Sequence, residues 1–307
     1  MNRKIIYSTL VISLVLIVIG AGLFIFLKPR AIDLQRKEIT QNSIEMSKAA
    51  VSTPTKSTSD KYDYYQQPAS DKLYVTSNHG KTWKTVPAAL SLIRGGDYSA
   101  IPDYELMPGS YILKKDLMAF VYPDKNSLAL FAFSKDAGKT WTKAPLDSDW
   151  KSLRFRQLDE MVDGTLIATL TEGRVMSQES GDIYQSSDGG SNWTKTGILP
   201  LTFLLQSASW TDKSHGFFGY KKDLKMTSDG GATLQDCQIN LPAEYHTEYG
   251  DIFTTPEKVV KSGDNYLLTM NQGDTGDYKG GKVMAELISS DGGLTFNFLK
   301  EVAGDDQ

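Results

Sequence analysis

The residues of this 307-residue chain that could carry out chemistry are first of all its carboxylates. A glycoside hydrolase needs two acidic side chains about 5 to 10 Å apart across a cleft, one acting as acid and one as base or nucleophile. The chain has 37 acidic residues, and nothing in their spacing selects a pair, so no catalytic residue is predicted and a solvated surface is expected for each. The candidates in loops or at strand ends are Asp97, Asp103, Glu105, Asp159, Glu160 and Glu172.

Metal, cofactor and nucleic-acid chemistry have little support in the sequence. His79, His215 and His246 have no partner at metal-ligand spacing, and the single Cys237 excludes internal disulfides and a multi-cysteine site. Residues 273–281, GDTGDYKGG, include two aspartates but lack the carboxylate density of a calcium loop. We therefore expect a flexible insertion there, and neither a metal nor a cofactor. A formal net charge of −4 disfavours nucleic acid as a partner.

The elements that must position any site are marked by an internal repeat. Five segments fit the pattern Ser/Thr-x-Asp/Asn-x-Gly-x-Thr/Asn-aromatic/Leu: Thr76–Trp83, Ser134–Trp141, Ser186–Trp193, Thr227–Leu234 and Ser289–Phe296. The third residue can accept hydrogen bonds across a tight turn, and the glycine takes a conformation that a Cβ would strain. A strand then begins, and its aromatic residue is expected in apolar packing. We predict a hairpin tip at each segment, with structural roles for Asn78, Gly80, Trp83, Asp136, Gly138, Trp141, Asp188, Gly190, Trp193, Asp229, Gly231, Asp291, Gly293 and Phe296.

The spacing of the segments predicts the architecture. Their third residues are 58, 52, 41 and 62 positions apart, and four short strands with turns need about 40 to 50 residues. Each interval therefore fits one four-stranded blade. Only one clear strand, at 72–76, precedes the first segment unless 62–67 adds another, so about five blades are favoured and a sixth stays open. Alternating runs predict further strands at Tyr111–Tyr122, Leu128–Phe133, Thr165–Thr171, Phe217–Tyr220 and Tyr266–Met270.

The five segments resemble the Asp-box (BNR) repeat of sialidases, two-propeller xyloglucanases, sortilin-type receptors and photosystem II assembly factors. The resemblance covers residues 73–299 and implies an all-β fold, a β-propeller; the unit Ser207–Leu234 looks like the assembly-factor repeat. Resemblance to sialidases would imply three arginines that hold the substrate carboxylate. After the predicted anchor segment, arginine is found only at Arg36, Arg94, Arg154, Arg156 and Arg174, and none follows Arg174. Sialidase activity is therefore not expected.

The N-terminal region predicts a membrane anchor. Residues 5–27 contain no charged side chain, and as a helix they would reach about 34 Å, enough to cross a hydrocarbon core of about 30 Å. A cleaved signal peptide would be shorter and would end at a small-residue site. We predict a tail and transmembrane helix at 1–30, a juxtamembrane segment and Ser/Thr-rich linker at 31–61, and the propeller at 62–307. The propeller is placed outside the cell by analogy, since the flanking charges do not determine the orientation.

Together these patterns predict a single-pass protein of the cell membrane with a non-enzymatic propeller. Radially arranged blades hold many loops on one rigid face, which suits the binding of a protein or glycan partner. One alternative is a carbohydrate-active glycoside hydrolase of sialidase-like fold. A second is an assembly factor for a membrane protein complex, which an anchor would place close to its client.

Overall fold

The computed structural model describes residues 56–94, 105–124, 129–146, 153–173, 178–248, 250–273 and 276–304. The predicted anchor at 5–27 and most of the predicted linker lie outside these ranges. In the part of the chain that is described, no helix is both long and apolar enough to cross a membrane.

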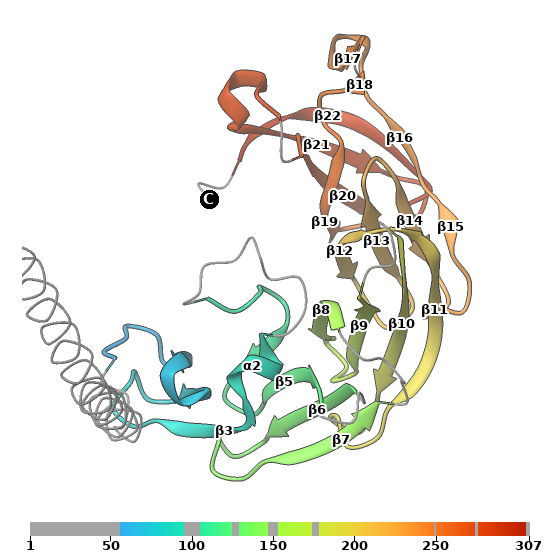
Figure 1. Ribbon diagram of the computed structural model, residues 1–307. Coiled ribbons are helices and arrows are strands. Elements are labelled where there is room, and N and C mark those ends of the chain that lie inside the picture. The colour runs from blue at the N-terminus through green and yellow to red at the C-terminus, as the bar shows by residue number, and fades with distance from the viewer. Residues whose placement is uncertain are drawn as a thin grey trace, which may run out of the picture. The chain divides into compact units, whose positions relative to one another are not determined.

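The described chain is all-β and forms one antiparallel sheet after another along the sequence (Figure 1). Sheet 1 consists of β1 (Asp63–Gln67), β2 (Lys72–Thr76) and β3 (Lys84–Ala89). Sheet 2 consists of β4 (Tyr111–Leu113), β5 (Met118–Pro123), β6 (Ala129–Ser134) and β7 (Thr142–Leu146). Sheet 3 consists of β8 (Leu153–Glu160), β9 (Leu166–Glu172), β10 (Gln178–Ser186) and β11 (Thr194–Phe203).

Sheet 4 consists of β12 (Leu205–Trp210), β13 (Gly216–Tyr220), β14 (Leu224–Thr227) and β15 (Gln235–Asp236). Sheet 5 consists of β19 (Thr255–Ser262), β20 (Asn265–Asn271), β21 (Val283–Ser289), β22 (Thr295–Ala303) and β16 (Gln238–Asn240). A separate hairpin pairs β17 (His246–Thr247) with β18 (Gly250–Asp251). The helices are short: α2 (Leu90–Ile93) and the 3-10 turns η1 (Pro68–Ser70), η2 (Ala243–Tyr245) and η3 (Tyr278–Gly281).

The order of strands agrees with the predicted meander in most places. Sheets 2, 3 and 4 each have four strands in sequence order, which is the arrangement of a propeller blade. In sheet 1, β1 supplies the second strand before the first segment, so this sheet has three strands. The run Tyr111–Tyr122, predicted as continuous, is instead β4 and β5 joined by a turn in which the Lys114 N–H donates to the Leu117 carbonyl. Three consecutive charged residues, 114–116, break the strand there.

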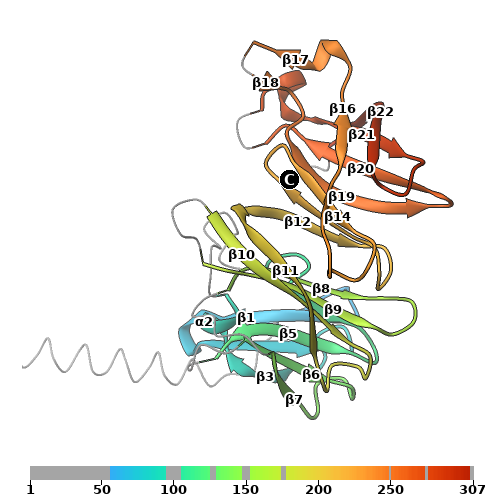
Figure 2. The ribbon, with the colours of Figure 1, turned by 90° about the vertical axis from the view of Figure 1, so that its right-hand side faces the viewer.

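Sheet 5 contains one strand that does not follow the order of the sequence. β16 follows the fourth segment in the sequence but pairs in parallel with β22, the last strand of the next sheet (Figure 2). The chain then returns through η2 and the β17–β18 hairpin before entering β19 at the other side of the sheet. β16 thus covers an edge of β22 that would otherwise expose unpaired backbone groups.

The core lies between consecutive sheets. Every residue of β5 is buried: Met118 and Phe120 belong to a cluster shared with sheet 1, while Ala119 and Val121 belong to one shared with sheet 3. Because successive residues of a strand point to opposite faces, a sheet packed on both sides needs apolar residues at successive positions and not only at alternate ones. Two further clusters of the same kind join sheets 3 and 4 and sheets 4 and 5.

Candidate functional site

The five repeated segments lie at hairpin tips, where a self-contained hydrogen-bond network closes each turn. In the third segment Asp188 Oδ1 accepts from the N–H groups of Ser191 and Asn192, at 2.9 and 3.0 Å, and from the Ser186 hydroxyl at 2.8 Å. Ser186 Oγ in turn accepts from the buried Gly190 N–H at 2.9 Å. The first and third positions of the pattern are therefore coupled through one hydroxyl–carboxylate contact.

These contacts keep the segment carboxylates ionised. The Thr140 N–H lowers the pKa of Asp136 to about 2, and the Thr233 hydroxyl lowers the pKa of Asp229 to about 2. The Asn192 N–H holds the pKa of Asp188 well below its usual range. A carboxylate with so low a pKa carries no proton near neutrality. The segment aspartates are thus turn-closing acceptors and cannot act as general acids.

The glycine at the fifth position also fits each sheet against the preceding one. In all five segments this glycine has a positive φ, between 74° and 104°. A Cβ on Gly231 would lie 2.8 Å from the Ile183 side chain of sheet 3, and one on Gly293 would lie 2.6 Å from Phe217 of sheet 4. Gly80 belongs to the first sheet of the described chain, and there the Lys56 carbonyl lies 2.7 Å from the built Cβ. The last residues of the predicted linker therefore pack on the first segment.

The fourth position has the same handedness but more room. His79 and Ala137 occupy it with φ of 60° and 61°, and around Gly292 no atom lies within 4 Å of a built Cβ. Left-handed backbone alone is tolerated by a non-glycine residue, at a cost. The additional contact with a neighbouring sheet explains why the fifth position holds glycine in every segment and the fourth does not.

The aromatic residues at the eighth position lie within the structure. The Trp193 ring centroid is 4.8 Å from that of Phe131 in sheet 2, and the Phe296 ring is 6.0 Å from Phe217 in sheet 4. The Trp193 indole N–H donates to the Gly190 carbonyl at 3.1 Å. Its ring is engaged with the protein, so it does not form a free platform for a sugar.

Two of the arginines considered for a carboxylate clamp hold the sheets together. Arg154 donates from Nε and Nη2 to Glu179, each at 2.5 Å, and Glu179, only 2% exposed, also accepts from the Leu205 N–H at 2.6 Å. Arg156, 1% exposed, donates to the carbonyls of Ile93 and Val121. Arg36 and Arg174 lie outside the described residues. Neither Arg154 nor Arg156 is free to bind a substrate carboxylate.

Asp159, Glu160 and Glu172, three candidate carboxylates in the described part of the chain, do not converge. Asp159 and Glu160 are neighbours on β8 and point to opposite faces, and Glu172 pairs with Leu153 at the other end of that ladder, about 20 Å away at 3.3 Å per residue. Burial raises the pKa of Asp159 to about 6, and its buried Oδ2 has no hydrogen-bond partner. Asp97 and Asp103 lie outside the described residues.

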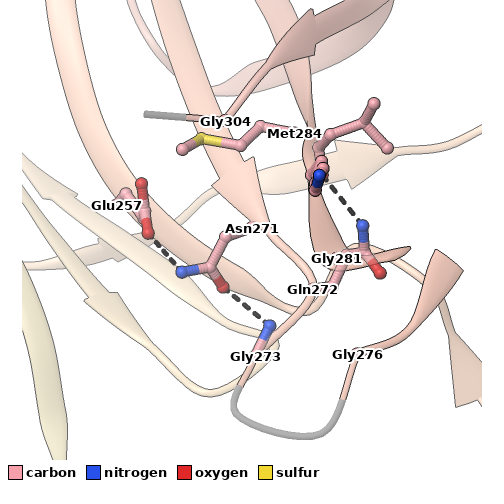
Figure 3. Close-up of a pocket in the computed structure, with 10 residues that line it drawn as sticks. Glu257, Asn271, Gln272, Gly273, Gly276, Gly281, Met284 and Gly304 are labelled. Atoms are coloured by element: carbon pink, nitrogen blue, oxygen red, sulfur yellow. Dashed lines mark hydrogen bonds between the residues drawn. The ribbon is translucent and has the colours of Figure 1, made fainter. Parts of the chain in front are cut away.

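A polar cleft lies where loops of sheets 4 and 5 meet, at the ends of β14 and β21 away from the repeated segments. It consists of two adjoining hollows of about 300 and 620 Å³. Both are lined by Asn271, the last residue of β20, and by Gln272, Gly273 and Gly276, which follow that strand (Figure 3). Described residues of the predicted insertion, Gly273, Gly276, Asp277, Tyr278 and Gly281, therefore form part of the wall. The described residues include no group of three His, Cys, Asp or Glu side chains placed to hold a metal.

A β-bulge places the carboxylate of Glu257 at the smaller hollow. The register of β19 against β20 shifts between Pro256 and Lys258, so Glu257 is the extra residue. Bulges commonly re-aim a side chain in this way. The Asn271 amide donates to Glu257 Oε1 and accepts from the Gly273 N–H at 2.7 Å (Figure 3). Within the described chain, Glu257 Oε2 has no hydrogen-bond partner.

Gln272 presents an unused acceptor between the two hollows. Its side chain is 8% exposed, and Nε2 donates to the carbonyls of Tyr278 and Val283, both at 2.9 Å. Oε1 is buried and has no partner. A buried polar atom without a hydrogen bond costs free energy, and a ligand donor would recover that cost if the Gln272 side chain turned its oxygen towards the cleft.

The larger hollow has a basic wall from sheet 4. Lys221 and Lys222 form the β13–β14 turn and line it; both are exposed, and no carboxylate of the described residues forms a salt bridge with either. Across the hollow, Asp251 accepts from His246 Nδ1 at 2.6 Å and raises the pKa of that histidine. Tyr278 is the one aromatic residue that lines the cleft in the described chain.

Sequence analysis identified the loop at 273–281 but not the side chains that make the cleft. Glu257, Gln272 and the two lysines belong to no motif, and the bulge that turns Glu257 inward leaves no pattern in the sequence. The one available signal was the interval of 62 residues between the last two segments, which is the longest of the four.

Comparison with known proteins finds no matching family model and no matching curated protein. Solved structures resemble the chain at low identity. An α-L-arabinofuranosidase, Arb93A, from Fusarium graminearum is 18% identical over 61% of this chain and 62% of its own, with a TM-score of 0.39. A Trypanosoma rangeli sialidase is 13% identical over 76% of this chain and 43% of its own, with a TM-score of 0.41. YCF48 bound to D1 peptide is 16% identical over 81% of this chain and 84% of its own, with a TM-score of 0.40. The chain thus spans less than two thirds of the arabinofuranosidase, and no activity is transferred at this distance.

Proposed function

We propose that this protein is a membrane-tethered, non-enzymatic Asp-box β-propeller of about five blades that binds a protein or glycan partner at the cell surface. The cleft between sheets 4 and 5 is the binding site in this proposal. The charge-free stretch at 5–27 would be the tether, and the proposed extracellular side is the one that presents the cleft to partners.

The observation that carries the proposal is the unused hydrogen-bonding capacity of the cleft. Gln272 Oε1 is buried without a partner, one oxygen of Glu257 has none among the described residues, and two exposed lysines form no salt bridge with a described residue. The carboxylates of the repeated segments and of the Arg154–Glu179 pair are, by contrast, satisfied within the protein, as Asp188 and Glu179 are. A ligand bound in the cleft would supply the missing partners.

A glycoside hydrolase is the second candidate, and Glu257 favours it. This carboxylate comes from a bulge, enters a hollow and keeps one oxygen free, as a nucleophile or base would. Against this, the Glu257 oxygen Oε1 accepts from Asn271, and the carboxylate with the raised pKa, Asp159, belongs to sheet 3 and does not line the cleft. Binding without turnover is therefore the better supported function.

Two measurements on the full-length protein in detergent test the proposal. A panel of chromogenic α- and β-glycosides should show no hydrolysis above a heat-inactivated control. Peptide and glycan arrays should show saturable binding that weakens at least about tenfold for Gln272→Lys, which fills the hollow, and is unchanged for Glu244→Gln, outside it. Hydrolysis that Glu257→Gln abolishes would replace this function with the enzymatic one.

The membrane assignment needs a separate experiment. Protease added to intact cells should degrade the propeller while the segment before residue 28 stays with the membrane fraction. A propeller that resists protease until the cells are lysed would place the cleft on the inner side of the membrane instead.

A further inference from the structure

The cleft carries opposite unpaired charges on walls from different sheets. Lys221 and Lys222 come from the β13–β14 turn of sheet 4, while Glu257 comes from β19 and Asp277 from the loop before η3, both of sheet 5. Lys282 also lines the smaller hollow. No salt bridge among the described residues neutralises any of these five side chains. The sheet 4 wall is therefore basic, the sheet 5 wall carries two carboxylates and one lysine, and the cleft has no strong net charge.

The position of Lys222 is held by the backbone. Its φ is 71°, in the left-handed region that a non-glycine residue seldom occupies, and its N–H donates to the Thr254 carbonyl at 2.7 Å. Its ammonium group lies beside Gly250, where a built Cβ would be 3.2 Å from Nζ. The turn thus directs a cation over the larger hollow at some cost in backbone strain, as is common at binding sites.

The acceptors on the other side need N–H donors. Both Glu257 and Gln272 lie on the sheet 5 side: Gln272 Oε1 is buried and accepts no hydrogen bond, and Glu257 accepts from the described residues through Oε1 alone. A guanidinium, an ammonium or a peptide N–H would satisfy them, and a guanidinium would in addition balance the Glu257 charge. Lys221 and Lys222, in contrast, would pair with a carboxylate of the ligand.

A sugar ligand fits this arrangement less well than a peptide. Sugar sites generally use an exposed aromatic face, and Tyr278, the one aromatic lining residue, is engaged. Its hydroxyl donates to Glu301 at 2.9 Å, and its ring packs edge-on against Tyr245 and Phe253. Acidic glycans would neutralise the lysines but would bring no cation to Glu257. An extended peptide brings both charges and backbone N–H groups together.

We infer that the cleft binds an extended peptide segment of a partner protein that carries an acidic side chain for Lys221 and Lys222 and a basic side chain for Glu257. This inference rests on the proposed binding function and specifies its ligand. Opposite charges at fixed positions give the complex a direction and a register, because a reversed peptide would place like charges together.

The test is a random dodecapeptide display library selected on the full-length protein in detergent, followed by fluorescence anisotropy with the best enriched peptide. We expect enriched sequences to combine one acidic and one basic position. Lys221→Glu with Lys222→Glu should weaken that peptide at least tenfold and favour a basic residue at the former acidic position. Glu257→Lys should reverse the preference at the basic position only.

Lys81→Glu with Lys139→Glu is the matched control, because both lysines lie at the tips of repeated segments and the change in net charge is the same. It should leave affinity within about twofold. Enriched peptides without paired charges, or equal losses in both double variants, would overturn the inference. If only glycan arrays bind, with loss in the Lys221/Lys222 variant, the peptide is wrong while the binding function stands. Hydrolysis of a glycoside that depends on Glu257 would overturn both the peptide inference and the proposed binding function.

Discussion

Adding one methyl group at each of two adjacent glycines tests whether the repeated segments hold neighbouring sheets in place. Gly292 and Gly293 occupy the fourth and fifth positions of the last segment, with φ of 81° and 96°. Gly292→Ala meets no atom within 4 Å, whereas Gly293→Ala places Cβ 2.6 and 2.7 Å from ring atoms of Phe217. The two variants share the conformational strain and differ in the contact with sheet 4.

The expected magnitudes follow from that difference. A non-glycine residue in the left-handed region costs about 1 to 2 kcal/mol, and this applies to both variants. Gly293→Ala adds overpacking, typically about 1 to 3 kcal/mol. Phe217 is fully buried, and its ring packs against Tyr266 and Phe296 at 5.1 and 6.0 Å, so it has little room to move. We expect losses of about 1 to 2 kcal/mol for Gly292→Ala and about 2 to 5 kcal/mol for Gly293→Ala.

Urea unfolding of the full-length protein in detergent, followed by tryptophan fluorescence, measures both free energies of unfolding. A third variant, Gly293→Ala with Phe217→Leu, should lose less than the sum of its single changes, because the smaller side chain leaves room for the methyl group. Equal losses for the two alanine variants, within about 0.5 kcal/mol, or strict additivity in the double variant would refute the explanation given for the invariant fifth position.

Three further outcomes follow from the polar groups. Burial raises the pKa of Asp159 from 3.8 to about 6, so its ionisation opposes folding once the pH exceeds 3.8. The free energy of unfolding of Asp159→Asn, measured in urea, should therefore rise relative to wild type by up to about 2 to 3 kcal/mol between pH 4 and pH 8. A difference that does not depend on pH would contradict this. Glu179→Gln leaves Arg154 without its counterion and should cost about 3 to 5 kcal/mol, with a smaller loss when Arg154→Met is added, as a double-mutant cycle can show. The Asp136 carboxyl, whose pKa is about 2, stabilises the fold above pH 3.8, and this effect is lost as the pH falls towards 2. Carbon NMR should find the carboxyl ionised at pH 3. A titration midpoint near pH 4 would mean that the hydrogen bonds of the turn are absent.

The strands and hairpin tips could be predicted because their signals are local. A turn needs particular residues within eight positions, and β6, β9, β13 and β20 are short apolar runs that read as strands wherever they pack. The break between β4 and β5 was missed because alternation on both sides outweighed three charged residues at the turn. β16 could not be predicted: Gln238–Asn240 is polar, and its conformation depends on β22, more than fifty residues away in the sequence.

The cleft escaped prediction for a related reason. Glu257 enters the hollow because of a register shift between two strands, and register depends on the whole pairing. Gln272 is notable only because its oxygen is left without a partner, which is a property of the packed structure. Lys221 and Lys222 resemble any exposed pair in sequence, and what distinguishes them is their place in the wall of the cleft.

The way in which the two insertions are fastened determines how cleanly binding can be measured. Glu301 on β22 accepts from the Tyr245 hydroxyl of η2 at 3.0 Å and from the Tyr278 hydroxyl of η3 at 2.9 Å, so both insertions are bound to the same strand of sheet 5. The lysines of the cleft take no part in this network. Exposed substitutions away from such contacts usually change stability by less than about 0.5 kcal/mol. Lys221→Glu with Lys222→Glu should therefore unfold like wild type, and a loss of peptide affinity in that variant can be attributed to the charges themselves.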